Sequence, residues 1–167
     1  MADWVGHALF AATIAMFLKT DKKSIVYLGA LLPDFFVKTA LLGIFFAVPK
    51  DFLDAFFYPT HTILGALILS SLFGIICSRL FNEEVRGTVL LVLIGYCSHL
   101  LLDLFNYHFL HIRGAVLFPL LVNFEIPGLL PGEYLWFWIV LVPLYVLCRI
   151  IFLWTRRSSL STNQLSS

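Results

Sequence analysis

Long apolar runs alternate with short polar connections along this chain. Apolar residues dominate the stretches 4–18, 24–32, 35–48, 60–78, 88–106 and 133–154. As a helix, a run of about 20 such residues crosses the roughly 30 Å hydrocarbon core of a bilayer. The pattern therefore predicts an all-α protein, an integral membrane helical bundle of about four to five spans.

Proline and glycine interrupt this pattern at two places. Pro33-Asp34 follows the run 24–32, and because proline disfavours helix at the residue before it, we expect a broken second helix near Leu32. Several Gly and Pro residues punctuate 107–131, which predicts a re-entrant or interfacial segment before the last span. We expect residues 1–155 to form a single transmembrane domain and the Ser-rich residues 156–167 to be a disordered polar tail.

Composition supports the membrane interpretation. Apolar residues make up 60% of the chain and charged residues only 13%, whereas soluble domains are nearer half apolar and a quarter charged. The net charge is +1, and the absence of a basic stripe argues against a nucleic-acid partner. Three cysteines placed singly in apolar runs suit packing better than a disulfide framework. The first run lacks a positive stretch before it, so we expect a retained helix and not a cleaved signal peptide.

Basic residues predict the orientation in the membrane. If the spans alternate, one side receives Lys19, Lys22, Lys23, Arg79, Arg86, Arg156 and Arg157. The other side receives Lys50 and Arg113. The positive-inside rule makes the first side cytoplasmic.

His99 and Asp103 are the most informative polar residues. They are four residues apart inside an apolar run, so on a helix they share one face. Lipid does not solvate such groups, which therefore need an internal partner or a ligand. In the predicted topology, His7, Asp34 and His61 come to the same level near the external face. We expect the five side chains to converge there.

Three imidazoles and two carboxylates suit a divalent metal, best Zn²⁺, with Mn²⁺ or Fe as alternatives. Five ligands are one too many for a single tetrahedral site with an open position, and they suit a pair of ions bridged by Asp103 or Asp34. Singly, each residue has another explanation: a hydrogen bond between helices for the His99–Asp103 pair, an interfacial position for His7, hydration for His61 and a helix cap for Asp34. Their joint convergence favours the metal site.

Three residues beyond Asp103 are candidates for substrate binding. His108 and His111 could extend the site, even to a third metal, or could be interfacial side chains that reach toward water. Arg113 could bind a substrate phosphate or a lipid head group.

The order of short motifs resembles a known family, the YdjM-type (LexA-regulated) membrane-bound metal-dependent hydrolases. The resemblance covers roughly residues 5–122 and includes the stretch from Gly114 to Leu120. It is carried by His7, by Leu31-Leu32-Pro33-Asp34, by Thr60-His61-Thr62 and by Gly95-Tyr96-Cys97-Ser98-His99-Leu100-Leu101-Leu102-Asp103.

This resemblance implies a function. The family is thought to be related to zinc-dependent phospholipase C and P1 nuclease, which are all-helical. It implies that His7, Asp34, His61, His99 and Asp103 are metal ligands, that Asp34 and Asp103 are catalytic, and that the substrate is a phosphoester. The family usually has His-Arg shortly before its Thr-His pair, where this chain has Phe56-Phe57. An anionic substrate would then be held by another group, such as Arg113 or Lys50.

We therefore expect a membrane-embedded hydrolase of a phosphoester, such as a phospholipid head group, that uses metal-activated water. Its partners would be membrane lipids, and its location a bacterial or archaeal cytoplasmic membrane. The main rival is a membrane carrier of metal ions or protons that uses the same cluster. Carriers place ionisable groups near the midplane and along a path through both leaflets. A third interpretation is a non-enzymatic assembly partner with interfacial histidines.

Overall fold

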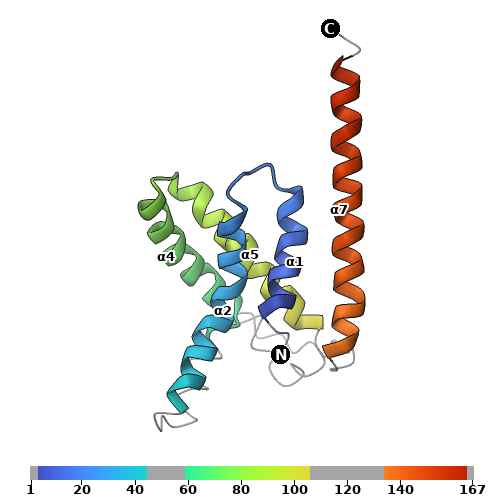
Figure 1. Ribbon diagram of the computed structural model, residues 1–167. Coiled ribbons are helices and arrows are strands. Elements are labelled where there is room, and N and C mark those ends of the chain that lie inside the picture. Colours follow the sequence, from blue (N-terminus) through green and yellow to red (C-terminus); the bar gives the residue numbers. More distant parts are fainter. Residues whose placement is uncertain (1–3, 45–58, 106–133, 165–167) are drawn as a thin grey trace.

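The computed structural model describes residues 4–44, 59–105 and 134–164, and helix is the only regular structure in this part of the chain (Figure 1). The predicted all-α class is confirmed. Five helices account for most of the described residues: α1 (Trp4–Phe17), α2 (Lys23–Ile44), α4 (Ile63–Phe81), α5 (Val85–Phe105) and α7 (Tyr134–Gln164).

Helix α5 is central to the packing of the bundle. It packs against α2, α4 and α1, and α7 packs against α1 (Figure 1). Val92, Tyr96 and Leu100 of α5 form a buried core with residues of α2 and α4. This arrangement brings the polar face of α5 to the middle of the bundle.

Two glycines allow α2 and α5 to approach closely. A Cβ atom on Gly29 would collide with the backbone carbonyl of Val92, and one on Gly95 would collide with that of Val26. Small residues at such contacts let membrane helices pack backbone against backbone. Gly95 lies one turn before His99 on α5, so this close contact also fixes the position of α2 beside His99.

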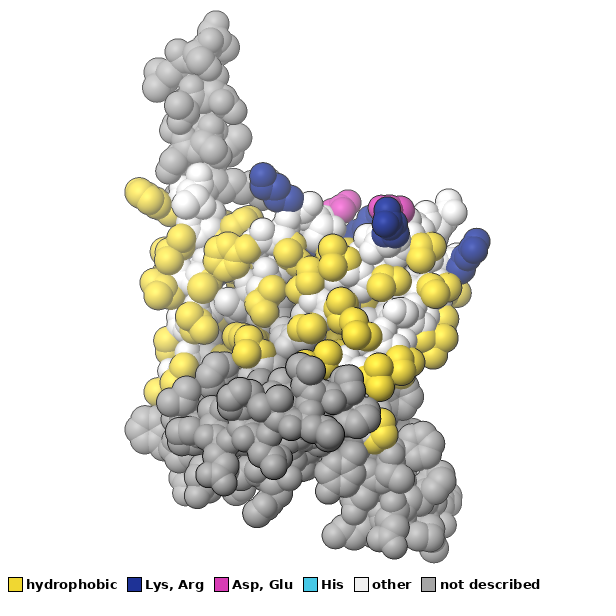
Figure 2. Space-filling model, turned by 180° about the vertical axis from the view of Figure 1, so that it is seen from behind, with side chains coloured by type: hydrophobic (Ala, Val, Ile, Leu, Met, Phe, Trp, Pro, Cys, Tyr) yellow, Lys and Arg dark blue, Asp and Glu magenta, His cyan; other side chains and the backbone are white. Residues whose placement is uncertain are grey.

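Polar groups mark one end of the bundle. Figure 2 shows Lys and Arg side chains gathered at that end, while hydrophobic side chains cover much of the remaining described surface in view. There Lys22, in the α1–α2 connection, pairs with Glu83, in the α4–α5 connection. Asn82 ends α4 in a left-handed conformation with φ of 54°, which Asn tolerates better than most residues.

Two helical segments, Ile63–Phe81 and Val85–Asp103, are long and apolar enough to cross a membrane. The apolar helical stretches Trp4–Phe17 and Ile139–Thr155 are shorter. Within the described residues, large apolar side chains are exposed along α4 and α7. A surface of this kind fits a lipid environment.

The structure differs from the sequence-based expectation in α2. This helix continues through Pro33 to Ile44, so the prediction of a broken second helix was wrong. Pro33 has no N–H for the carbonyl of Gly29, but packing against neighbouring helices sustains membrane helices through such a gap.

The end of the chain also differs. Helix α7 continues to Gln164, so residues 156–164 of the expected disordered tail are helical. Extending an existing helix costs far less than starting one, which explains why polar residues can prolong α7. The expected re-entrant segment 107–131 lies outside the described residues.

Candidate metal centre

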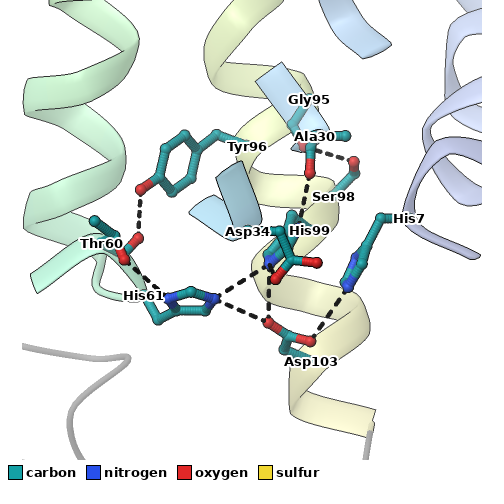
Figure 3. A network of polar contacts seen from close by, with 10 residues as sticks. All are labelled: His7, Ala30, Asp34, Thr60, His61, Gly95, Tyr96, Ser98, His99 and Asp103. Atoms are coloured by element: carbon teal, nitrogen blue, oxygen red, sulfur yellow. Dashed lines mark hydrogen bonds and ion pairs between the residues drawn. The ribbon is translucent and has the colours of Figure 1, made fainter. Parts of the chain in front are cut away.

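Four segments of the chain together bring five polar side chains to one point (Figure 3). α1 supplies His7, α2 supplies Asp34, α5 supplies His99 and Asp103, and the turn before α4 supplies His61. All five side chains are buried, with exposed fractions between 0% and 3%. Burial to this degree is rare for carboxylates unless they are paired or bind a metal.

Three ligand atoms form a compact triangle. His99 Nε2 lies 3.1 Å from Asp103 Oδ2 and 3.4 Å from His61 Nε2. The third side, from His61 Nε2 to Asp103 Oδ2, is 3.7 Å. Asp34 Oδ1 lies 3.9 Å from His99 Nε2, and His7 Nε2 lies 3.5 Å from the other oxygen of Asp103, Oδ1.

A backbone carbonyl fixes which nitrogen of His99 faces the cluster. His99 Nδ1 lies 2.7 Å from the carbonyl oxygen of Ala30. Because a carbonyl can only accept, Nδ1 carries the hydrogen and donates it, and Nε2 of the neutral ring presents a lone pair. Ligating histidines are held in this way by a hydrogen bond to their second nitrogen.

Contacts also fix the orientation of the other two imidazoles, those of His61 and His7. His61 Nδ1 lies 3.0 Å from Thr60 Oγ1, which leaves Nε2 directed at the cluster. The rings of His7 and His99 stack with centroids 3.7 Å apart and an interplanar angle of 14°.

The triangle has the dimensions of a divalent metal site. With Zn–N bonds of about 2.0–2.1 Å and tetrahedral angles, neighbouring ligand atoms lie about 3.3–3.4 Å apart. The three sides of 3.1, 3.4 and 3.7 Å span this value. A neutral His99 and an ionised Asp103 would otherwise direct lone pairs at each other, so a proton or a cation belongs between them. The buried His and Asp groups can therefore hold a metal ion.

A second layer of residues supports His61. Tyr96, fully buried in α5, donates a hydrogen bond from its hydroxyl to the carbonyl of Thr60. Thr62 caps α4 by accepting from Gly65 N at 2.9 Å and donating to the carbonyl of Pro59 at 2.8 Å. The turn that carries His61 is thus tied both to α5 and to its own helix.

Sequence reasoning missed this second layer. The signal for Tyr96 was present, because it lies three residues before His99 and so near the same helical face. The carbonyls of Ala30 and Thr60 left no signal in the sequence.

The structure brings together all five residues expected to be ligands. His61 directly precedes Thr62, the N-cap of α4. Ser98 donates to the carbonyl of Gly95 at 2.6 Å, within its own helix. The expected substrate-binding residues His108, His111 and Arg113 lie outside the described residues, as do Lys50, Phe56 and Phe57.

The cluster lies well away from the basic end of the bundle. At 1.5 Å per residue, Asp34 is about 17 Å along α2 from Lys23, and Asp103 is about 26 Å along α5 from Arg86. A hydrocarbon core is roughly 30 Å thick. If the basic residues lie at one membrane surface, the cluster falls in the half of the core nearer the other surface.

Comparisons with known proteins agree with the membrane character of the chain. No curated protein and no solved structure matches it. A family model described as YdjM inner membrane protein matches residues 1–161. The match covers nearly the whole chain and confirms both the expected family and the membrane location. This protein therefore belongs to the YdjM inner membrane protein family.

Proposed function

We propose that this protein is a membrane-embedded, metal-dependent hydrolase of a phosphoester. The observation that carries the proposal is the buried triangle of His61, His99 and Asp103, whose sides of 3.1–3.7 Å fit a divalent cation. Zn²⁺ suits this mixture of imidazole and carboxylate best, and Mn²⁺ and Fe²⁺ are alternatives. The resemblance to metal-dependent hydrolases supports the same activity.

Asp103 is the residue best placed to bridge two ions. Its Oδ2 belongs to the triangle, whereas its Oδ1 faces His7. His99 can serve only one ion, because its Nδ1 is bonded to Ala30. The two groups that could hold an ion, His7–His99–Asp103 and Asp34–His61–His99, overlap at His99. By their distances, His61, His99 and Asp103 would hold the first ion, and His7 with the second oxygen of Asp103 would contribute to a further one.

A bound divalent ion would supply Lewis acidity toward phosphoryl oxygens and an activated water. The other roles in the reaction would fall to side chains of the protein. Asp34, 3.9 Å from His99 Nε2, would orient the attacking water and accept its proton. The apolar side chains around the cluster would limit the entry of bulk water and strengthen electrostatic interactions inside.

We further propose a bundle of four to five spans, with the cluster in the external leaflet. The support is the gathering of basic side chains at the opposite end of the molecule (Figure 2). By the positive-inside rule that end faces the cytoplasm. A substrate would then reach the site from the external side.

A carrier of metal ions or protons is the second candidate. Its support is the depth of the cluster, which is compatible with a binding site inside a membrane. A carrier also needs polar groups along a path through both leaflets. In the described segments, both groups able to hold a metal belong to this one cluster. This distribution favours the hydrolase.

Metal analysis of the detergent-purified protein tests the proposal. We expect one or two equivalents of Zn, Mn or Fe in the unmodified protein and a loss of the first ion in His99→Ala and Asp103→Asn. Ser98→Ala is the matched control, because its hydroxyl bonds only to its own helix. Absence of metal, or equal metal content in all variants, would reject the site. If metal is present, a screen of phosphomonoesters and phospholipids separates a hydrolase from a carrier.

A further inference from the structure

An apolar pocket lies along the outer side of α2, close to the metal centre. It has a volume of about 350 Å³ and is lined by Trp4, Leu28, Leu31, Leu32, Phe35 and Phe73. These residues come from α1, α2 and α4, and Figure 1 shows α2 between the other two helices. The volume falls within the range of about 300–1,000 Å³ that is typical of small-molecule sites. We call this cavity the α2 pocket.

On two helices, residues that line the α2 pocket are close in sequence to residues of the metal centre. Leu32 and Phe35 flank Pro33-Asp34 in α2, and Asp34 belongs to the cluster. Trp4 lies about one turn before His7 on α1. One end of the pocket is therefore at the level of the metal centre.

The pocket extends from that level toward the basic end of the bundle. Phe35 is about 18 Å along α2 from Lys23, whereas Leu28 is only about 7 Å from it. If the cluster lies in the external leaflet, this direction leads toward the bilayer midplane. A lipid of the external leaflet is oriented in the same way as the pocket, with its head group at the outer surface and its acyl chains directed toward the midplane.

The chemistry of the lining selects the apolar part of such a molecule. All six lining side chains are hydrophobic, and apart from the indole N–H of Trp4 none of them carries a hydrogen-bonding group. Each buried methylene contributes about 0.8 kcal/mol of transfer free energy from water. In a protein of the YdjM inner membrane protein family, the apolar molecules available to such a pocket are the acyl chains of the surrounding lipids.

We propose that the α2 pocket holds an acyl chain of a phospholipid substrate and thereby places its phosphoester at the metal centre. This inference rests on the proposed hydrolase function and names its substrate class. In the reaction, the oxygen of water bonds to phosphorus, the P–O bond to the lipid alcohol breaks, and the alcohol oxygen takes a proton. Short-chain and fully soluble phosphoesters lack the part that the pocket recognises.

Filling the pocket tests the proposal. In Leu28→Phe/Leu31→Phe, two larger side chains occupy the cavity from α2. Leu64→Phe/Leu67→Phe is the matched control, because it makes the same change at the same spacing on the exposed face of α4, outside the pocket. The substrates are phosphatidic acids with dioleoyl or with dibutyryl chains, and metal content is measured in parallel.

We expect the pocket variant to lose about tenfold in kcat/KM with the dioleoyl substrate, which corresponds to about two buried methylenes. Its kcat/KM with the dibutyryl substrate and its metal content should match those of the control. Equal losses with both substrates, or equal effects of both variants, would overturn the acyl-chain assignment.

A binding measurement tests whether the pocket holds an acyl chain and does not depend on catalysis. Trp4 lines the pocket, and replacing the other three tryptophans, Trp136, Trp138 and Trp154, by Phe leaves it as the sole tryptophan. In detergent, phosphatidic acid with brominated acyl chains should quench Trp4 saturably, and the pocket variant should need about tenfold more lipid. Non-saturable quenching, identical in both variants, would reject the pocket. If saturable quenching occurs but neither substrate is cleaved, the hydrolase proposal fails while acyl binding stands.

Discussion

Replacing Tyr96 by Phe removes a single oxygen atom and tests how the metal centre is held together. The Tyr96 hydroxyl donates to the carbonyl of Thr60, and Thr60 Oγ1 lies 3.0 Å from His61 Nδ1. Without the hydroxyl, the carbonyl of Thr60 loses this hydrogen bond, and the turn that carries His61 loses one of its contacts with α5. We therefore expect His61 to sample orientations in which Nε2 no longer faces the cluster.

The expected effect is large enough to measure. Loss of a hydrogen bond made directly to a metal ligand typically weakens metal affinity by about 10–100-fold, and this range is an upper bound here because Tyr96 reaches His61 only through Thr60. On the scale of about 1.4 kcal/mol per tenfold change, this equals about 1.4–2.8 kcal/mol. Leaving a buried carbonyl without its donor costs about 1–3 kcal/mol, which is of the same size.

The assay is a competition for Zn²⁺ between the purified protein and a chromophoric chelator in detergent. Tyr27→Phe is the control, because Tyr27 packs beside a different core cluster in α2. Thr60→Val should weaken binding as well, and because both changes act through His61, the double variant should lose less than the sum of the two. An affinity of Tyr96→Phe within twofold of the Tyr27→Phe value would refute the proposed support of His61.

Three further predictions concern packing, stoichiometry and the basic end. Gly95→Ala should lower the free energy of unfolding by about 1–3 kcal/mol, because its Cβ would collide with the carbonyl of Val26. Gly87→Ala is the control and should not lower it, because the nearest atom there is a flexible Glu84 oxygen at 3.3 Å. Equal thermal stability of the two variants in detergent would contradict the close packing. His7→Ala should keep the first metal ion and lose any second one; loss of all metal would show that His7 belongs to the first site. Lys22→Ala should cost under about 1 kcal/mol, because its ion pair with Glu83 is partly exposed; a larger change in thermal unfolding would mean that this contact supports more than the two connections.

Parts of this site could be predicted from the sequence for a physical reason. His99 and Asp103 are separated by one helical turn, so their shared face followed from helix geometry alone. His7, Asp34 and His61 required the alternation of spans, and the structure indeed places all five side chains together. Membrane helices make such inference easier because their directions alternate.

Other parts could not be predicted, because they depend on tertiary packing. The helix through Pro33 persists in a bundle that supports α2 from several sides, whereas local propensity favours a break. The ties from His99 to Ala30 and from Tyr96 to Thr60 end on main-chain oxygens, which every residue carries. Only the spatial register of α2, α4 and α5 determines which oxygen is used.

The division of the cluster among four segments has a consequence for biogenesis. A nascent helix that carries an Asp at its centre enters the bilayer at a cost of roughly 2.5–3.5 kcal/mol, and Asp34 lies near the middle of α2. Asp103 has His99 within its own helix, whereas Asp34 meets His99 only after α2 and α5 have associated. We therefore expect metal supply to influence the yield of assembled protein during membrane insertion, so that cells starved of the ion accumulate separated, protease-sensitive helices.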